Sequence, residues 1–279
     1  MPDPGAPPPA LPGDAESHPV GNAEPPSPGA GDAGRPSTRP WGAWATAGLA
    51  AVILVVYTAL QLLAGGGLGA ALAARSGVAP TRAELARLLD SHFGLVLWVS
   101  LVVAAPLAAA ATALAAGIRR PPSLTAELGL VRPRWRPALA WLAVTLAFTF
   151  AYDTLSAALD RPVVPEYLER AYRTATFLPG LVVAVVVAAP LFEELLFRGF
   201  LYAGLARSRL GPRGAIAVTA AVFAAIHIQY DLLDMTAILG LGLILGAARW
   251  RTGSTLLTLG LHAAVNLAAM VEMVWILRG

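Results

Sequence analysis

Long apolar segments, each close to the length of one membrane span, dominate the chain. A helix needs about 20 apolar residues to cross roughly 30 Å of hydrocarbon, and seven such segments follow an N-terminal region rich in proline and glycine. We predict spans at Gly42–Ala64, Gly94–Ala116, Ala138–Leu159, Pro179–Ala206, Gly214–Gln229, Met235–Trp250 and Ser254–Leu277. The sequence therefore predicts an all-α fold, a polytopic membrane helix bundle of about seven transmembrane helices with a disordered N-terminal tail.

The composition agrees with a membrane protein and excludes several other classes. Hydrophobic residues make up 57% of the chain and charged residues only 13%. All 20 basic residues are arginines, and they fall between apolar segments instead of clustering on a solvated domain, so we expect no nucleic-acid partner. The absence of cysteine excludes thiolate nucleophiles and cysteine-ligated metals.

The segments outside the predicted spans show how the chain is divided. Residues 1–40 lack apolar periodicity and are predicted to be a disordered tail. Residues 81–90 (TRAELARLLD) place three leucines on one helical face and predict a short interfacial helix. A tight turn is expected at Tyr230–Asp234, between the fifth and sixth spans. We divide the chain into the tail (1–40), N-terminal transmembrane helices and loops (41–178) and a C-terminal core (179–277), which the motifs described below identify as the catalytic part.

The arginines also predict the orientation. With the N-terminus in the cytoplasm, twelve of them lie on the cytoplasmic side and seven on the other, with Arg198 inside the membrane. We therefore expect an integral membrane protein with a cytoplasmic N-terminus and an external C-terminus. The arginine-only and alanine-rich composition resembles the usage of a GC-rich genome and favours a bacterial plasma membrane.

The stretch PLFEELLFRGF (190–200) places charges inside the fourth predicted span. A carboxylate at membrane depth costs about 2.5–3.5 kcal/mol or more, so each one implies a local use. Glu194 and Arg198 are four residues apart and can form a structural ion pair on one helix face. Glu193 points about 100° away from Glu194 and has no nearby cation on its own face, so it is the candidate for chemistry.

Further polar groups occur in the later spans. His227 ends FAAIH in the predicted fifth span, whereas His262 and Asn266 bracket HAAVN in the seventh. Each is costly against lipid, and all are satisfied if they face inward together with Glu193. Glutamate and histidine around a water provide a general base, and histidine with asparagine can stabilise an oxyanion, which points to amide hydrolysis. The same residues allow a zinc alternative with Glu193, His227 and His262 as ligands.

Two other classes compete with a hydrolase. Intramembrane acidic and imidazole groups also suit a proton-coupled transporter, but the sequence shows no convincing internal repeat. A non-catalytic scaffold or bacteriocin-immunity protein is the other alternative. No cofactor is certain, and zinc is the one that the residue types allow.

Three motifs in order resemble a known family. EELLFR (193–198) matches EExxxR, FAAIH (223–227) matches FxxxH and HAAVN (262–266) matches HxxxN, as in the CPBP (CAAX protease and bacteriocin-processing, or Abi) intramembrane endopeptidases. ELGL at 127–130 is similar to a segment often found upstream in that family. The resemblance implies a helical membrane protein that hydrolyses a peptide bond of a membrane-embedded or lipid-anchored peptide or protein.

The resemblance also implies residue roles. Glu193 would act on water with His227, while His262 and Asn266 would support the oxyanion. Glu194 and Arg198 would shape the site, and Phe223 would pack beside it. Both a metalloprotease and a metal-free glutamate mechanism are described for the family, and we favour the metal-free one. The eukaryotic members cut prenylated CAAX proteins, and other members are linked with bacteriocin maturation or self-immunity.

Overall fold

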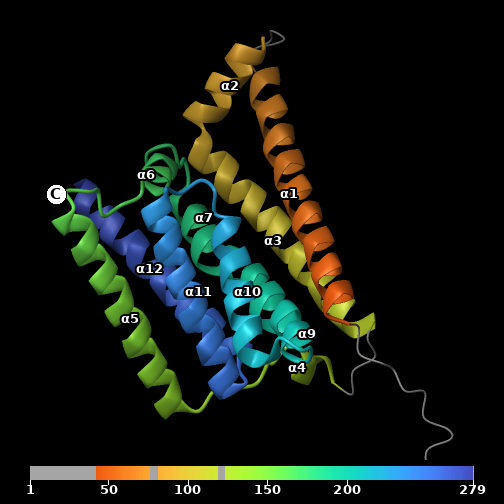
Figure 1. The fold of residues 1–279 in the computed structure, drawn as a ribbon. Coiled ribbons are helices and arrows are strands. Elements are labelled where there is room, and N and C mark those ends of the chain that lie inside the picture. The colour runs from red at the N-terminus through yellow and green to blue at the C-terminus, as the bar shows by residue number, and fades with distance from the viewer. Residues whose placement is uncertain (1–41, 76–80, 119–122, 279) are drawn as a thin grey trace, which may run out of the picture. The chain divides into compact units, whose positions relative to one another are not determined.

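The computed structural model describes residues 42–75, 81–118 and 123–278, and the predicted tail at 1–40 lies outside them. All regular elements of the described residues are helices, and six are long and apolar enough to span a membrane. These are α1 (Ala43–Ala74), α3 (Phe93–Ile118), α5 (Trp135–Ala158), a composite helix (Leu178–Ala206), α11 (Leu232–Thr252) and α12 (Thr255–Arg278) (Figure 1). The predicted polytopic helix bundle is confirmed.

The predicted fifth span corresponds to the shorter helix α10 (Gly211–Ala225). Its 15 residues extend about 22 Å at 1.5 Å per residue, less than the thickness of the hydrocarbon. The predicted sixth span is longer than expected, because α11 has 21 residues. The count of about seven membrane helices therefore becomes six long helices and one short helix within the described residues.

Three short helices join the spans: α2 (Arg82–Ser91), α4 (Leu124–Glu127) and α6 (Glu166–Arg173). The short helix predicted at 81–90 is present as α2. Thr81 caps its N-terminus, where the Thr81 hydroxyl accepts from the Glu84 N–H and the Glu84 carboxylate accepts from the Thr81 N–H. Leu85 and Leu89 of α2 pack against α1 at Gly69, where the absence of a side chain leaves room for them.

The composite helix lies at the centre of the bundle. It is contacted by α1, α3, α10 and α12, whereas α5 packs against α11 and α12 (Figure 1). Its aromatic side chains Phe192, Phe197 and Phe200 are completely buried. Helices α1 and α5, in contrast, expose large apolar side chains such as Leu63 and Phe150, as expected of surfaces that face lipid.

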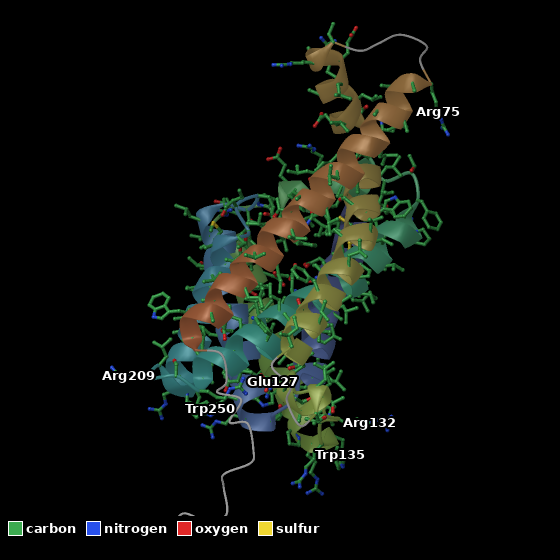
Figure 2. The ribbon with its side chains drawn as sticks, turned by 90° about the vertical axis from the view of Figure 1, so that its right-hand side faces the viewer. Arg75, Glu127, Arg132, Trp135, Arg209 and Trp250 are labelled. Atoms are coloured by element: carbon green, nitrogen blue, oxygen red, sulfur yellow. The ribbon has the colours of Figure 1, made fainter. Side chains whose placement is uncertain are left out.

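Arginine and tryptophan side chains mark the ends of the bundle. Arg132, Trp135, Arg209 and Trp250 lie at one end and Arg75 lies at the other (Figure 2). Both residue types are typical of the membrane boundary. The split agrees with the predicted topology, which places Arg75 on the opposite side from Arg132 and Arg209; which side is cytoplasmic stays a prediction.

The composite helix changes its hydrogen-bond pattern twice. It runs through α7 (Leu178–Val183), a π-helical turn η1 (Ala184–Ala188), α8 (Ala189–Glu194), a second π-helical turn η2 (Leu195–Leu201) and α9 (Tyr202–Ala206). In η1 the Ala189 N–H donates to the Ala184 carbonyl, five residues back. The next carbonyl, that of Val185, would need the N–H of residue 190 in this pattern, and Pro190 has none. The Asn266 side-chain amide of α12 donates to this carbonyl instead, at 2.8 Å.

Close packing of α10 on α11 depends on a glycine. A Cβ atom added at Gly242 would lie 3.0 Å from the Cβ and 3.1 Å from the Cα of Ala220. Small residues allow membrane helices to approach this closely. The Gly242 carbonyl also accepts a hydrogen bond from Nη2 of Arg198 on the composite helix, at 3.3 Å.

The connection between α10 and α11 begins earlier than predicted. Helix α10 ends at Ala225, and α11 begins at Leu232 because the Asp231 carboxylate accepts hydrogen bonds from the N–H groups of Leu233 (2.8 Å) and Asp234 (3.1 Å). The predicted turn at Tyr230–Asp234 is therefore wrong, since the turn occupies residues 226–231. The prediction that His227 lies inside a span is also wrong, because His227 belongs to this turn.

Replacing Asp231 by alanine is expected to lower thermal stability, because Asp231 caps α11 and forms an ion pair with Arg161 beyond the end of α5. A lost cap costs about 0.5–2 kcal/mol. The backbone N–H of Asp234, together with Arg161 and the Leu233 N–H, holds the pKa of the Asp231 carboxyl below its ordinary value. The stabilisation is thus present above the unfolded pKa of about 4 and is lost as the pH falls through the lower folded pKa.

Thermal unfolding of purified protein in detergent, measured over a range of pH, checks this. The Tm difference between the wild type and Asp231→Ala should be full at neutral pH and shrink in acid. Asp231→Asn, which keeps a capping oxygen, should lose less. Equal Tm values for all three proteins at neutral pH would contradict the capping role.

Candidate active site

A buried ion pair lies at the base of the site. Nη1 of Arg198 is 2.8 Å from Oε1 of Glu194, and both side chains are almost completely buried. The two residues are four apart on the same helix face, as predicted from the sequence. The guanidinium also donates to the Gly242 carbonyl, so the cation is anchored to α11 as well as to the glutamate.

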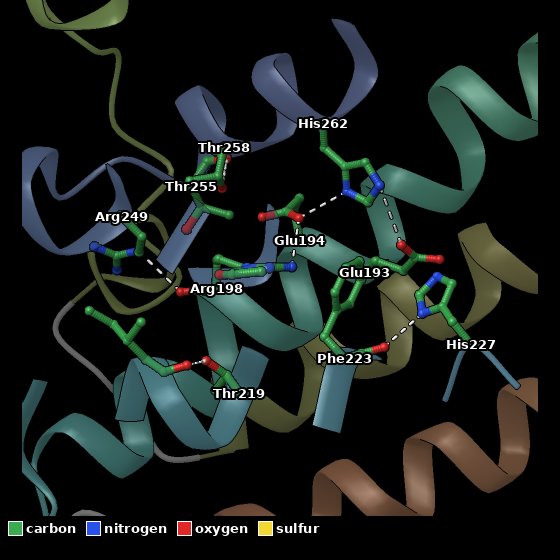
Figure 3. A network of polar contacts seen from close by, with 12 residues as sticks. Glu193, Glu194, Arg198, Thr219, Phe223, His227, Arg249, Thr255, Thr258 and His262 are labelled. Carbon is green, nitrogen blue, oxygen red and sulfur yellow. Dashed lines mark hydrogen bonds and ion pairs between the residues drawn. The ribbon is translucent and has the colours of Figure 1, made fainter. Parts of the chain in front are cut away.

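His262 joins this pair to Glu193. Its Nδ1 lies 3.0 Å from Oε1 of Glu194, and its Nε2 lies 3.7 Å from Oε2 of Glu193 (Figure 3). Because an ionised carboxylate only accepts hydrogen bonds, Nδ1 carries the proton. The Nε2–Oε2 separation exceeds a direct hydrogen bond, so Nε2 stays available to another group. Glu194 thereby fixes the orientation of a ring that faces Glu193.

His227 approaches Glu193 from the turn after α10. Its Nδ1 lies 2.6 Å from the carbonyl oxygen of Phe223, to which it donates. This bond leaves Nε2 as the free nitrogen. The Phe223 ring packs edge-on against both imidazoles, with centroid distances of 4.7 Å to His227 and 5.8 Å to His262. Phe223 thus lies between the two histidines, in contact with both rings.

The four predicted catalytic residues line one cavity of about 510 Å³. Glu193, His227, His262 and Asn266 all contribute to its wall, and so does Phe223. Glu194 and Arg198 lie outside the wall, where they support it. Side chains that are far apart in the sequence are therefore brought around one space, as inward-facing polar groups require.

Asn266 has a structural partner that the sequence did not reveal. One of its amide hydrogens is used by the Val185 carbonyl that Pro190 leaves without a donor. The side chain keeps a second N–H and its carbonyl oxygen for the cavity. Asn266 therefore fastens α12 to the composite helix and also borders the cavity.

The ELGL segment (127–130) supports the site from a distance. Its glutamate pairs with Arg207, and two of its carbonyl oxygens accept hydrogen bonds from the N–H and hydroxyl of Thr255. Its glycine packs against Arg249, whose Nε donates to the Arg198 carbonyl at 3.1 Å. The segment thus ties the start of α12 and the end of α11 to the second π-helical turn.

The residues of the site match zinc in donor type but not in arrangement. Glu193, His227 and His262 are donors that zinc accepts, and both histidines have Nδ1 held by a partner, as metal ligands usually do. Across residues 42–75, 81–118 and 123–278, however, no three His, Asp or Glu side chains are grouped as metal ligands. As arranged, the three side chains do not form a zinc site.

Sequence reasoning missed several residues of the cavity. Tyr57, Tyr152, Tyr167, Tyr230 and Asp234 also line it. The stretch YTALQ (57–61) gave a signal for the first helix, because it places a tyrosine and a glutamine four residues apart in an otherwise apolar span. The other tyrosines lie in segments whose packing only the fold reveals.

The comparisons with known proteins agree with this site. The structure defines a polytopic helical membrane protein in which an acid and two imidazoles line one cavity. Residues 175–268 match the family model described as type II CAAX prenyl endopeptidase Rce1-like. This match confirms the resemblance to the CPBP family. Searches of curated proteins and of solved structures gave no significant match.

Removing Arg198 alone is expected to destabilise the protein strongly, because Glu194 would remain as an unpaired buried charge. Breaking a buried pair costs about 3–5 kcal/mol. Thermal unfolding of Arg198→Met should show a large drop in Tm, and the double variant Glu194→Gln/Arg198→Met should recover part of it. A single variant as stable as the wild type would contradict the role of the pair.

Proposed function

We propose that the protein is an intramembrane endopeptidase that hydrolyses a peptide bond of a membrane-embedded or lipid-anchored substrate. The observation that carries the proposal is the convergence of Glu193, His227, His262 and Asn266 on one cavity. The match to the Rce1-like family supports the same class of reaction.

Glu193 is the proposed general base. Its carboxylate takes a proton from a water molecule, and the resulting hydroxide attacks the carbonyl carbon of the scissile amide. His227 assists through Nε2, which its Nδ1 bond to the Phe223 carbonyl leaves unprotonated in the neutral ring. This geometry suits an attack by water directly, without a covalent acyl-enzyme.

His262 and Asn266 are the proposed oxyanion donors. The tetrahedral intermediate places a negative charge on the former carbonyl oxygen, which needs donors fixed in advance. The free N–H of Asn266 is one donor, and His262 donates through Nε2 when both ring nitrogens are protonated. Collapse of the intermediate breaks the C–N bond, the proton held by Glu193 passes to the leaving nitrogen, and a carboxylic acid and an amine are formed; proton transfer between them then gives a carboxylate and an ammonium group.

The substrate is proposed to be a peptide near the membrane surface or within it. The cavity wall combines the polar groups with apolar side chains of three long helices, including Leu54, Leu97 and Leu241. This lining suits a peptide that carries an apolar side chain or a lipid anchor. A prenylated peptide is the first to test, because the matching family model is described as a prenyl endopeptidase.

Glu193→Gln and His227→Ala are each expected to lower kcat/KM at least about 100-fold, since each removes a proton-transfer group. The assay uses protein in liposomes and a fluorogenic peptide ending in a CAAX sequence, with and without a farnesyl group. Glu272→Gln, a matched change on α12 away from this cavity, should retain activity. Full activity of either site variant would remove the protease assignment.

The metal question is decided by a separate experiment. Because the three possible ligands are not grouped as a zinc site, we expect the purified protein to cleave the peptide after chelation and to contain no stoichiometric zinc. Elemental analysis and chelator titration measure this. Activity that is lost on chelation and restored by zinc would establish the metal mechanism.

A further inference from the structure

Three tyrosines from separate elements line the cavity together with Glu193. Tyr57 belongs to α1, Tyr167 to α6, and Tyr230 to the turn between α10 and α11. Tyr57 and Tyr167 lie outside the segment 175–268 that matches the family model. The family match therefore assigns no role to Tyr57 or Tyr167.

Tyr57 is the most constrained of the three. It is only 9% exposed, and its ring packs on Phe192, the neighbour of Glu193, with a centroid distance of 4.2 Å. Its hydroxyl has no hydrogen bond to any residue that the structure describes, yet the side chain borders the cavity. A buried polar group with a fixed orientation normally has a partner, and here the partner can come only from the cavity.

Tyr167 and Tyr230 continue the same wall. Their ring centroids are 5.6 Å apart, and Tyr230 lies 6.1 Å from His227. Neither hydroxyl forms a hydrogen bond within the described part of the chain. Burial raises the pKa of Tyr167 to about 12 and raises that of Tyr230, with Glu193 adding to both. Both phenols therefore keep their protons at neutral pH and act as hydrogen-bond donors.

A peptide in a membrane cavity needs such donors. Its main-chain carbonyl oxygens leave water on entering the site and must find new partners. Neutral phenols supply donors without adding charge beside the carboxylate of Glu193. They also have low conformational freedom, which reduces the entropy lost on binding.

We propose that Tyr57, together with Tyr167 and Tyr230, forms a phenol subsite that binds main-chain carbonyl oxygens of the substrate peptide beside Glu193. The inference rests on the proposed peptidase function and adds substrate-positioning residues to it. Because a carbonyl beside the scissile bond is bound equally in the ground state and the transition state, the subsite acts on KM more than on kcat.

The test compares Tyr57→Phe with the wild type on the farnesylated fluorogenic peptide in liposomes. The variant keeps the ring on Phe192 and loses only the hydroxyl. KM should rise about three- to ten-fold with kcat within about two-fold, the effect of one lost hydrogen bond. Tyr172→Phe, on α6 but outside the cavity wall, is the matched control and should leave KM unchanged.

A second arm identifies the bond itself. Peptides with a thioamide in place of one carbonyl at a time should show one position that raises KM in the wild type but not in Tyr57→Phe, as coupled partners do in a mutant cycle. Tyr167→Phe repeats the test at a second phenol. If no position shows this coupling and KM is unchanged in both variants, the subsite is refuted while cleavage by the wild type still supports the protease.

A binding measurement keeps the two proposals separate. In a Glu193→Gln background, the affinity for the same farnesylated peptide should fall about three- to ten-fold when Tyr57→Phe is added. An unchanged Kd overturns the subsite whatever the activity of the protein. Absence of cleavage by the wild type, with a weaker Kd in the double variant, overturns the proposed function and leaves the phenol subsite as a peptide-binding site.

Discussion

The site depends on the ion pair between Glu194 and Arg198, because neither charge could be buried without the other. An isolated ion at membrane depth is costly, and Arg198 and Glu194 are almost wholly inaccessible. Their 2.8 Å contact is supplemented by Gly242 on one side and His262 on the other. Since Glu194 holds Nδ1 of His262, the ion pair sets the direction in which the opposite nitrogen faces. The ion pair that neutralises the two buried charges therefore also holds the imidazole of His262 beside Glu193.

The composite helix adds a second constraint. Pro190 and the π-helical turn before it leave the Val185 carbonyl without a main-chain donor, and the Asn266 amide of α12 takes its place. This bond and the His262–Glu194 hydrogen bond connect the helix that carries His262 to the helix that carries Glu193. On the other side, the small residue at Gly242 lets α11 approach closely. Hydrogen bonds from side chains to main-chain carbonyls thus connect α11 and α12 to the composite helix beside the cavity.

Sequence patterns predicted those features of the structure that depend on residues close together in the chain. The spacing of Glu194 and Arg198 gives their pair, and apolar length gives the membrane helices. The end of α10 was missed because its sequence stays apolar through Ile228 apart from His227, while the start of the next helix is set by the Asp231 cap. The role of Asn266 toward Val185 and the convergence of Tyr57 and Tyr167 on the cavity could not be predicted, because they arise from contacts between different helices that are far apart in the sequence. The predicted domain division, orientation and residue roles stay predictions.

The central claim is that Glu193 faces a cavity that water can enter at membrane depth. The chain contains no cysteine, so a single cysteine introduced at this position can be followed with a water-soluble thiol reagent. Because such reagents react with the thiolate, which forms only in contact with water, Glu193→Cys should be labelled in intact membranes. Val187→Cys, on the lipid-exposed face of the same composite helix, should be labelled only after denaturation. Equal resistance of both positions to labelling in the folded protein would contradict the account.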